Sequence, residues 1–125
     1  MKREQRLTRS TDIKRVRLQG KAYAHPLIVL KALSNDSTQL HIGVTVGKAV
    51  GNAVTRNKTK RRLKACLQAL VPILVPGWDL VIIARTPISS ATYAEVEHGV
   101  FNVLKRAQLL GNREVLNDDR VRISQ

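Results

Sequence analysis

The most informative stretch of the chain is strongly basic and reads Gly51-Asn52-Ala53-Val54-Thr55-Arg56-Asn57-Lys58-Thr59-Lys60-Arg61-Arg62-Leu63-Lys64. It holds six Lys or Arg residues and no Asp or Glu. Apolar residues continue beyond it at helical spacing, which predicts a helix from about Ala53 to Leu70. Leu63, Cys66, Leu67 and Leu70 would form an apolar stripe that packs on a sheet, beside a separate basic face.

Strand patterns lie on both sides of this helix. Residues 40–46 alternate large apolar with small or polar side chains, as expected of a half-buried strand. Residues 79–84 are almost continuously apolar, as expected of a strand covered on both faces. A helix that joins two such strands predicts a mixed sheet with helices packed on it.

Two further helices and another strand region complete the prediction. Ser10 or Thr11 can cap a first helix that runs to about Leu18. Residues 22–33 are rich in strand formers, with Pro26 at a strand edge or an irregular start. Thr92 and Glu95 form a capping-box pattern that begins a last helix, which we expect to run to about Leu110. The fold class is therefore α+β.

Length and composition predict one domain with an aliphatic core. The chain has 125 residues, of which 43% are hydrophobic and only 3% aromatic. We assign residues 1–110 to this domain, with residues 1–9 flexible, and residues 111–125 to a polar tail. The single cysteine suits a reducing compartment, and no secretory or membrane-spanning pattern is visible, so we expect a cytoplasmic protein.

The positive charge is concentrated in two segments. The net charge is +13, and residues 1–21 together with residues 47–64 account for all of it. Cations four residues apart on one helix, such as Arg56 and Lys60, repel each other by a few tenths of a kcal/mol. A solvated helix face is the simplest alternative, but the absence of acids favours a polyanionic partner, with nucleic acid as the first candidate.

The sequence shows no catalytic or metal-binding constellation. His25, His41 and His98 are dispersed, and none has the Cys, His or carboxylate spacing of a metal site. No nucleophile, base and orienting group stand together. Cys66 falls on the apolar stripe, so we expect it in the core. We therefore predict no catalytic residues and no metal ligands in the protein.

The motif Gly51-Asn52-Ala53-Val54-x-Arg56-Asn57-x-x-Lys60-Arg61 closely resembles the signature of the protein subunit of bacterial ribonuclease P. The resemblance continues through residues 42–51, residues 79–87 and the helix with Tyr93, and it covers about residues 6–110. It implies a four-stranded mixed sheet with three helices, a left-handed crossover through the basic helix, and a ribosomal-protein-like fold. Connections of this kind are usually right-handed, so the sequence pattern alone does not predict that handedness.

The resemblance also implies the function and the partners. A protein cofactor of ribonuclease P would bind the catalytic RNA and the 5′ leader of precursor tRNA, and so promote 5′ maturation by endonucleolytic cleavage. The RNA would carry the chemistry with Mg²⁺, and the protein alone would bind no cofactor. We expect one protein monomer per RNA. The residues that would contact the catalytic RNA are Lys48, Asn52, Arg56, Asn57, Lys58, Lys60, Arg61, Arg62 and Lys64.

The leader would lie in a cleft between the first helix and the sheet. The residues that match the cleft positions are Ile13, Arg17 and Lys31, where the family usually presents aromatic side chains, and Arg15 could add a phosphate contact in the cleft. Base stacking on aromatic rings contributes about 1–3 kcal/mol per base, so leader binding here should depend more on phosphate contacts. Tyr23 is a possible stacking residue. Asn52 could instead act as a loop or capping residue.

Other functions explain parts of the sequence. A non-enzymatic RNA-binding or ribosomal-type protein would explain the charge and the fold, but not the Gly-Asn-Ala-Val-x-Arg-Asn string. A helix-turn-helix DNA-binding module lacks the required preceding helix, since a strand precedes the basic one. A membrane-surface helix would need a bulky apolar face that this helix lacks.

Overall fold

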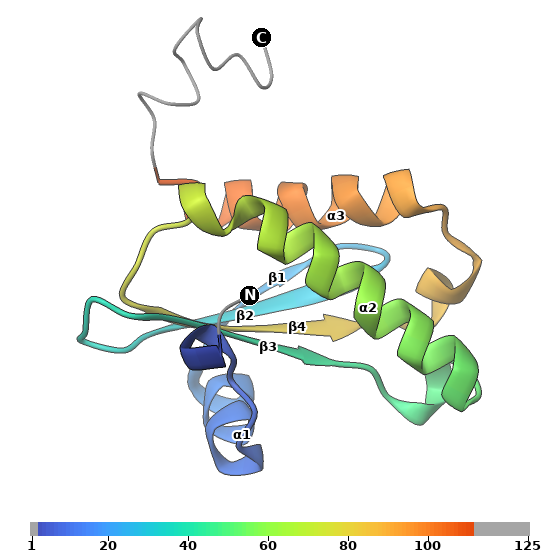
Figure 1. The fold of residues 1–125 in the computed structure, drawn as a ribbon, viewed down its shortest axis with the longest axis horizontal. Helices are drawn as coiled ribbons and strands as arrows, with labels where there is room; N and C mark the ends of the chain where they lie inside the picture. Colours follow the sequence, from blue (N-terminus) through green and yellow to red (C-terminus); the bar gives the residue numbers. More distant parts are fainter. Residues whose placement is uncertain (1–2, 112–125) are drawn as a thin grey trace, which may run out of the picture.

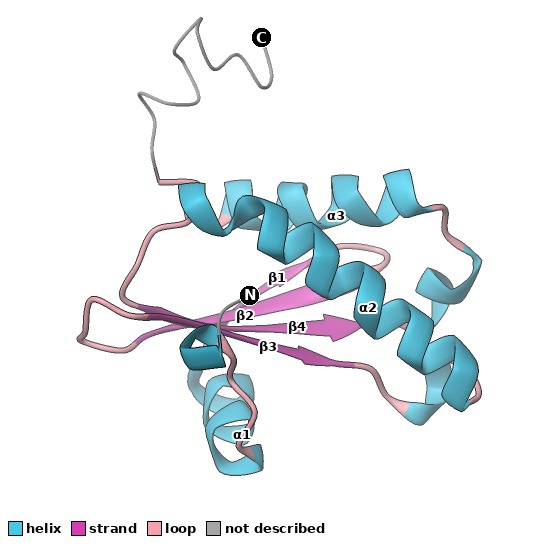
Figure 2. Cartoon of the chain, in the orientation of Figure 1, coloured by secondary structure: helices cyan, strands magenta, loops and turns pink. Residues whose placement is uncertain are grey.

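The computed structural model describes residues 3–111, which form a four-stranded sheet covered by helices on both faces (Figure 1). The helices and strands follow in the order α1 (Ser10–Gln19), β1 (Lys21–Ala24), β2 (Ile28–Ser34), β3 (Leu40–Thr45), α2 (Ala53–Leu70), β4 (Trp78–Ala84) and α3 (Tyr93–Arg106). Short 3-10 turns lie between some of them (Figure 2). Helix α1 packs on one face of the sheet, whereas α2 and α3 cover the other.

The sheet is mixed, with strand order β1-β2-β4-β3. Strand β2 is antiparallel to both β1 and β4, whereas β3 runs parallel to β4 in a register that pairs Leu40 with Trp78 and Thr45 with Ile83. Helix α2 is the crossover between these parallel neighbours. The predicted α+β class, the four-stranded mixed sheet and the three helices are confirmed. The left-handed sense of the crossover stays a prediction.

Two apolar clusters hold the layers together. The larger one lies between the sheet and α2 and α3, and its fully buried members include Leu30, Leu63, Leu67, Leu80 and Leu104. The smaller one joins α1 to the opposite face of the sheet through Leu7, Val16 and Val81. Strand β4 contributes to both clusters, which confirms that it is covered on both faces. The predicted apolar stripe of α2 is confirmed as well, although Leu70 is only half-buried.

The N-terminal segment makes specific contacts where we expected flexibility. Leu7 is only 7% exposed, and its backbone N–H donates to the carbonyl oxygen of Ile42 over 2.8 Å. Arg6 pairs with Ile42 as an isolated parallel bridge. The segment therefore lies along β3, which is an edge strand of the sheet and has free backbone groups there. The expected tail begins at residue 111, and residues 112–125 lie outside the described part of the chain.

Two local predictions, for the ends of α1 and α3, need correction, and the strand prediction for residues 22–33 is made more precise. Ser10 and Thr11 do not cap α1, because the helix already begins at Ser10 and its N-cap is Arg9, which makes no side-chain capping bond. Residues 22–33 form a hairpin of two strands, since Pro26 lies in the turn between β1 and β2. Helix α3 ends at Arg106 and not near Leu110, because Gln108 has a φ of 61° and Leu110 pairs with Leu74. The capping box that begins α3 is confirmed.

Candidate RNA interface

The Gly51-Asn52 pair builds the start of the basic helix. Asn52 is the N-cap of α2, and its side-chain oxygen accepts a hydrogen bond from the backbone N–H of Thr55 over 2.9 Å. At Gly51, φ is 158°, and an added Cβ would lie only 2.9 Å from Cγ2 of Thr55. The structure therefore explains both residues of the motif: Asn52 caps the helix, and a side chain at position 51 would collide with Thr55. The structure shows Asn52 as a capping residue, which was the alternative to an RNA contact. A contact between its side-chain NH2 group and RNA stays a prediction.

Replacing Asn52 measures how much the cap contributes to stability. We expect Asn52→Ala to lower the free energy of unfolding by about 1 kcal/mol, because the first turn of α2 loses an acceptor. Asn52→Ser keeps a capping oxygen and should restore most of that stability. Chemical denaturation of both variants measures the difference. Equal stability of the alanine and serine variants would show that the cap does not matter.

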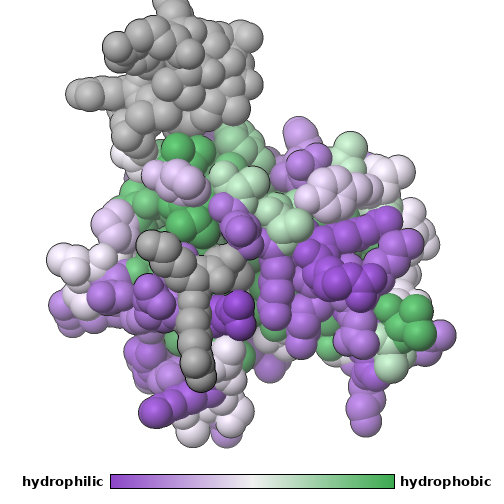
Figure 3. Space-filling view, in the orientation of Figure 1, coloured by the Kyte–Doolittle hydropathy of each residue, from purple (hydrophilic) through white to green (hydrophobic). Residues whose placement is uncertain are grey.

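All nine residues predicted to contact the catalytic RNA lie at the surface of α2 or just before it. Lys48 and Asn52 are exposed, as are Asn57, Lys58, Lys60, Arg61 and Lys64, whereas Arg56 and Arg62 are half-buried. Hydrophilic side chains form a broad band over α2 (Figure 3). Within residues 3–111, no carboxylate lies within 4.0 Å of a cation on this helix. Within the described residues, the charge of this helix is therefore not neutralised by a neighbouring carboxylate.

Helix α2 borders a hollow on each of its two sides. The first, which we call the β3-edge groove, has a volume of about 250 Å³ and is lined by Arg6, Leu7, Thr8, Ile13, Ile42, Gly43, Val44, Lys60 and Lys64. The second, which we call the helix pocket, has a volume of about 230 Å³ and is lined by Val54, Thr55, Lys58, Thr59, Arg62, Ile88, Ser89 and Val96. Lysine side chains thus reach both hollows from one helix.

Only one of the residues predicted for the leader cleft lines the β3-edge groove. Ile13 does so, at a place where Lys60 and Lys64 supply charge. Arg17 is exposed on α1, and Lys31 is half-buried in β2 on the sheet face that α1 covers. Neither lines this groove, and their contact with a leader stays a prediction. Sequence reasoning missed Arg6 and Thr8, because they lie in the segment that we expected to be flexible.

Tyr23 is placed on the wrong face for a leader stacking residue. It pairs with Leu30 across the hairpin and packs against the larger apolar cluster, under α2 and α3. The ammonium nitrogen of Lys21 lies 5.5 Å from the centre of its ring, within the range of a cation–π contact. The idea that Tyr23 stacks on leader bases beside α1 is therefore wrong.

A buried carboxylate next to α1 is the main feature that the sequence did not reveal. Asp79 is 3% exposed, and its oxygens lie 2.8 Å from a guanidinium nitrogen of Arg15, from Nδ2 of Asn35 and from Nδ1 of His41. Burial alone raises the pKa of Asp79, but the hydrogen bonds from these three side chains outweigh it, and the pKa is lowered. Arg15, predicted as a leader contact, is thus already paired within the chain. Its contact with a leader stays a prediction.

The remaining titratable groups of the described residues include no cluster of metal ligands and no activated thiol. In the part of the chain that the structure describes, no three or more His, Cys, Asp or Glu residues are placed to hold a metal ion. Cys66 is buried in the core as expected, and burial raises the pKa of its thiol despite a hydrogen bond from Tyr93. A thiol with a raised pKa is a poor nucleophile.

Among the described helices, none combines the length and apolar character needed to cross a membrane.

These features define a class of protein: a small α+β domain that presents a polycationic helix to a phosphate-rich partner. The family model for ribonuclease P matches residues 1–108, and the chain therefore belongs to that family.

Curated relatives and solved structures agree with this assignment. The ribonuclease P protein component of Herpetosiphon aurantiacus is 34% identical over 114 residues, which cover 91% of this chain and 93% of the relative. The corresponding protein of Dehalococcoides mccartyi strain ATCC BAA-2266 is 40% identical over 110 residues, which cover 88% and 90%. The structure of the Staphylococcus aureus RNase P protein superimposes with a TM-score of 0.79 at 27% identity, covering 86% of this chain and 98% of that one.

Proposed function

We propose that this chain is the protein cofactor of ribonuclease P and that it binds the catalytic RNA along α2. The residues that would contact this RNA are Lys48, Asn52, Arg56, Asn57, Lys58, Lys60, Arg61, Arg62 and Lys64. The observation that carries this proposal is the row of surface cations on α2, none of which has a carboxylate within 4.0 Å among the described residues. Arginine grips phosphate oxygens in pairs, and lysine adds a compact charge.

The 5′ leader of precursor tRNA would bind beside the same helix, where Lys60 and Lys64 border the β3-edge groove. The β3-edge groove joins Ile13 of α1 to Lys60 and Lys64 of α2, so that a single strand passing there would meet apolar surface and positive charge together. Arg17 and Lys31 would extend these contacts over the sheet face that α1 covers. Arg6 also lines this groove, and we add it to the residues that would contact the leader.

We assign the chemistry to the RNA. Hydrolysis of a phosphodiester in such an assembly would use Mg²⁺ held by RNA and substrate phosphates, because Mg²⁺ prefers oxygen ligands and keeps part of its water shell. The protein would supply binding and orientation of the substrate. We place the assembly in the cytoplasm, with one protein monomer for each RNA.

Reconstitution tests this function. We expect the chain, added to a bacterial catalytic RNA at limiting Mg²⁺, to accelerate release of the 5′ leader from precursor tRNA. The chain without RNA should release none at any Mg²⁺ concentration. An unrelated protein of similar net charge serves as the control for unspecific charge neutralisation, and it should accelerate cleavage much less. Cleavage by the chain free of RNA, or no acceleration beyond the control, would overturn the proposal.

A further inference from the structure

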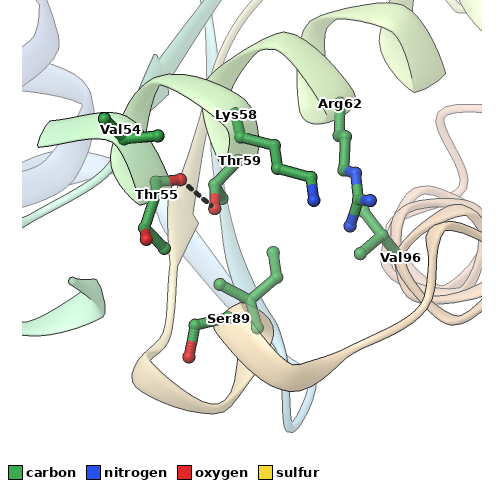
Figure 4. A pocket seen from close by; sticks show the side chains of 8 residues that line it. Val54, Thr55, Lys58, Thr59, Arg62, Ser89 and Val96 are labelled. Carbon is green, nitrogen blue, oxygen red and sulfur yellow. Dashed lines mark hydrogen bonds between the residues drawn. The ribbon is translucent and has the colours of Figure 1, made fainter. Parts of the chain in front are cut away.

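The helix pocket has the size of a site for a small planar group. It lies where the first half of α2 meets the turn η4 (Thr86–Ser90) and the start of α3 (Figure 4). Its volume of about 230 Å³ is below the range of about 300–1,000 Å³ that is common for drug-sized ligands. A single unpaired base is a ligand of the right scale.

The floor and wall of the pocket are apolar. Ile88 and Val96 close it from η4 and α3 and are themselves 3% and 2% exposed. Val54 lies on the first turn of α2 with 77% of its surface exposed, and among the described residues it is the only large hydrophobic residue exposed on this helix. An apolar patch over the start of α2 adjoins the hydrophilic band in the space-filling view (Figure 3). An apolar partner would bury this surface.

The rim of the pocket is cationic. Lys58 and Arg62 are one helical turn apart and extend toward the same side of α2 in Figure 4. Neither has a carboxylate within 4.0 Å among the described residues. A guanidinium plane can stack on a base, and an ammonium group can bind the adjoining phosphate. Ser89 at the mouth carries a hydroxyl, which donates to the carbonyl oxygen of Thr86 over 3.2 Å.

We propose that the helix pocket binds one unpaired nucleobase of the catalytic RNA, packed on Val54, Ile88 and Val96, with its phosphate beside Lys58. The inference rests on the proposed function and adds a site to it. RNA-binding proteins commonly take up bases that are splayed out of single-stranded loops and bulges. The pocket lies on the sheet face covered by α2 and α3, whereas α1 lies on the opposite face (Figure 1). The catalytic RNA on α2 is therefore the source of the base, and not the leader beside α1.

Two variants of exposed residues test the pocket. Val54→Asn removes apolar surface, and Ser89→Trp obstructs the mouth; both positions are exposed, and thermal melting verifies that each variant folds. We expect each to weaken binding to the catalytic RNA about tenfold, because a base contact is lost. The slope of log K against log salt should stay unchanged, since no phosphate contact is removed. Lys58→Ala should instead reduce that slope by about 0.7–0.9.

Leu18→Asn is the matched control, because Leu18 is also an exposed aliphatic residue, at 74%, but lies on α1. It should bind the catalytic RNA like the wild type. Chemical probing provides a second measurement: the wild-type chain should protect an unpaired base from dimethyl sulfate, and Ser89→Trp should abolish that protection.

The proposal that the pocket binds a base would be contradicted if both pocket variants bound with wild-type affinity, or if Ser89→Trp left the pattern of base protection unchanged. Either result would leave RNA binding along α2 intact. If the variants weaken only the binding of precursor tRNA to the assembled enzyme, the pocket holds the leader and the proposal is wrong. If the wild-type chain itself fails to bind the catalytic RNA, both the proposed base binding in the pocket and the proposed function are contradicted.

Discussion

Replacing Arg56, Lys60 and Arg61 together with alanine should weaken binding to the catalytic RNA about a hundredfold at moderate salt. Each lost phosphate contact removes counterion release, so the slope of log K against log salt should become shallower by about 2–3. Folding should not suffer, because the change relieves the repulsion between Arg56 and Lys60, which are four residues apart on α2. We expect the free energy of unfolding to stay within about 0.5 kcal/mol of the wild type.

A second triple variant controls for charge alone. Lys14, Lys21 and Lys105 are exposed cations on α1, β1 and α3, and their replacement with alanine removes the same charge from other surfaces. This variant should bind the catalytic RNA with a much smaller loss. Equal losses in the two variants would mean that net charge, and not the face of α2, determines binding. A large drop in melting temperature of the α2 variant would indicate a structural role for its cations.

The second large effect is expected at Asp79. Asp79→Asn removes a buried charge that accepts hydrogen bonds from Arg15, Asn35 and His41, and it replaces one of the two accepting oxygens with an amide NH2 group that cannot accept. Hydrogen bonds to charged groups contribute about 1.5–3 kcal/mol each, and Arg15 can still reach water, so we expect a loss of about 2–3 kcal/mol in the free energy of unfolding. Urea denaturation measures it.

The pH dependence of stability provides an independent check on Asp79. The pKa of this carboxyl is lowered in the folded chain, so the unfolded chain binds its proton more readily. The stabilisation is thus complete above about pH 4 and is lost as the pH falls through the lowered folded value. The Asp79→Asn variant should lose less stability than the wild type over that range. Asp36→Asn, at an exposed loop carboxylate, is the control. Equal acid sensitivity of the wild type and Asp79→Asn would contradict this role.

The basic helix could be predicted from the sequence because its pattern is local. The spacing of Leu63, Cys66 and Leu67 alone determines which side of α2 packs on the sheet, and the cations then fall on the remaining sides. The alternation in β3 and the apolar run in β4 are local in the same way, and so is the capping box that begins α3. Local periodicity was sufficient to place the surface that we assign to the catalytic RNA.

The network at Asp79 could not be predicted, because its partners are far apart in the chain. Arg15 is 64 residues away, Asn35 is 44 and His41 is 38. A carboxylate at the start of an apolar strand was the only signal, since a buried charge needs partners. The β3-edge groove could not be predicted for the same reason, because Arg6 and Thr8 reach it only where Leu7 packs beside Ile42. The helix pocket depends on η4 and α3, which begin at Thr86 and Tyr93, whereas α2 ends at Leu70.

Salt titration of RNA binding tests the central claim most directly, namely that cations on α2 bind the phosphates of a folded catalytic RNA. Lys48 and α2 supply seven cations. If most of them contact phosphates, the affinity of the wild-type chain should fall about a thousandfold between about 50 and about 200 mM monovalent salt. An affinity that stays nearly constant over this range would contradict the account, since it would mean that few phosphates are bound.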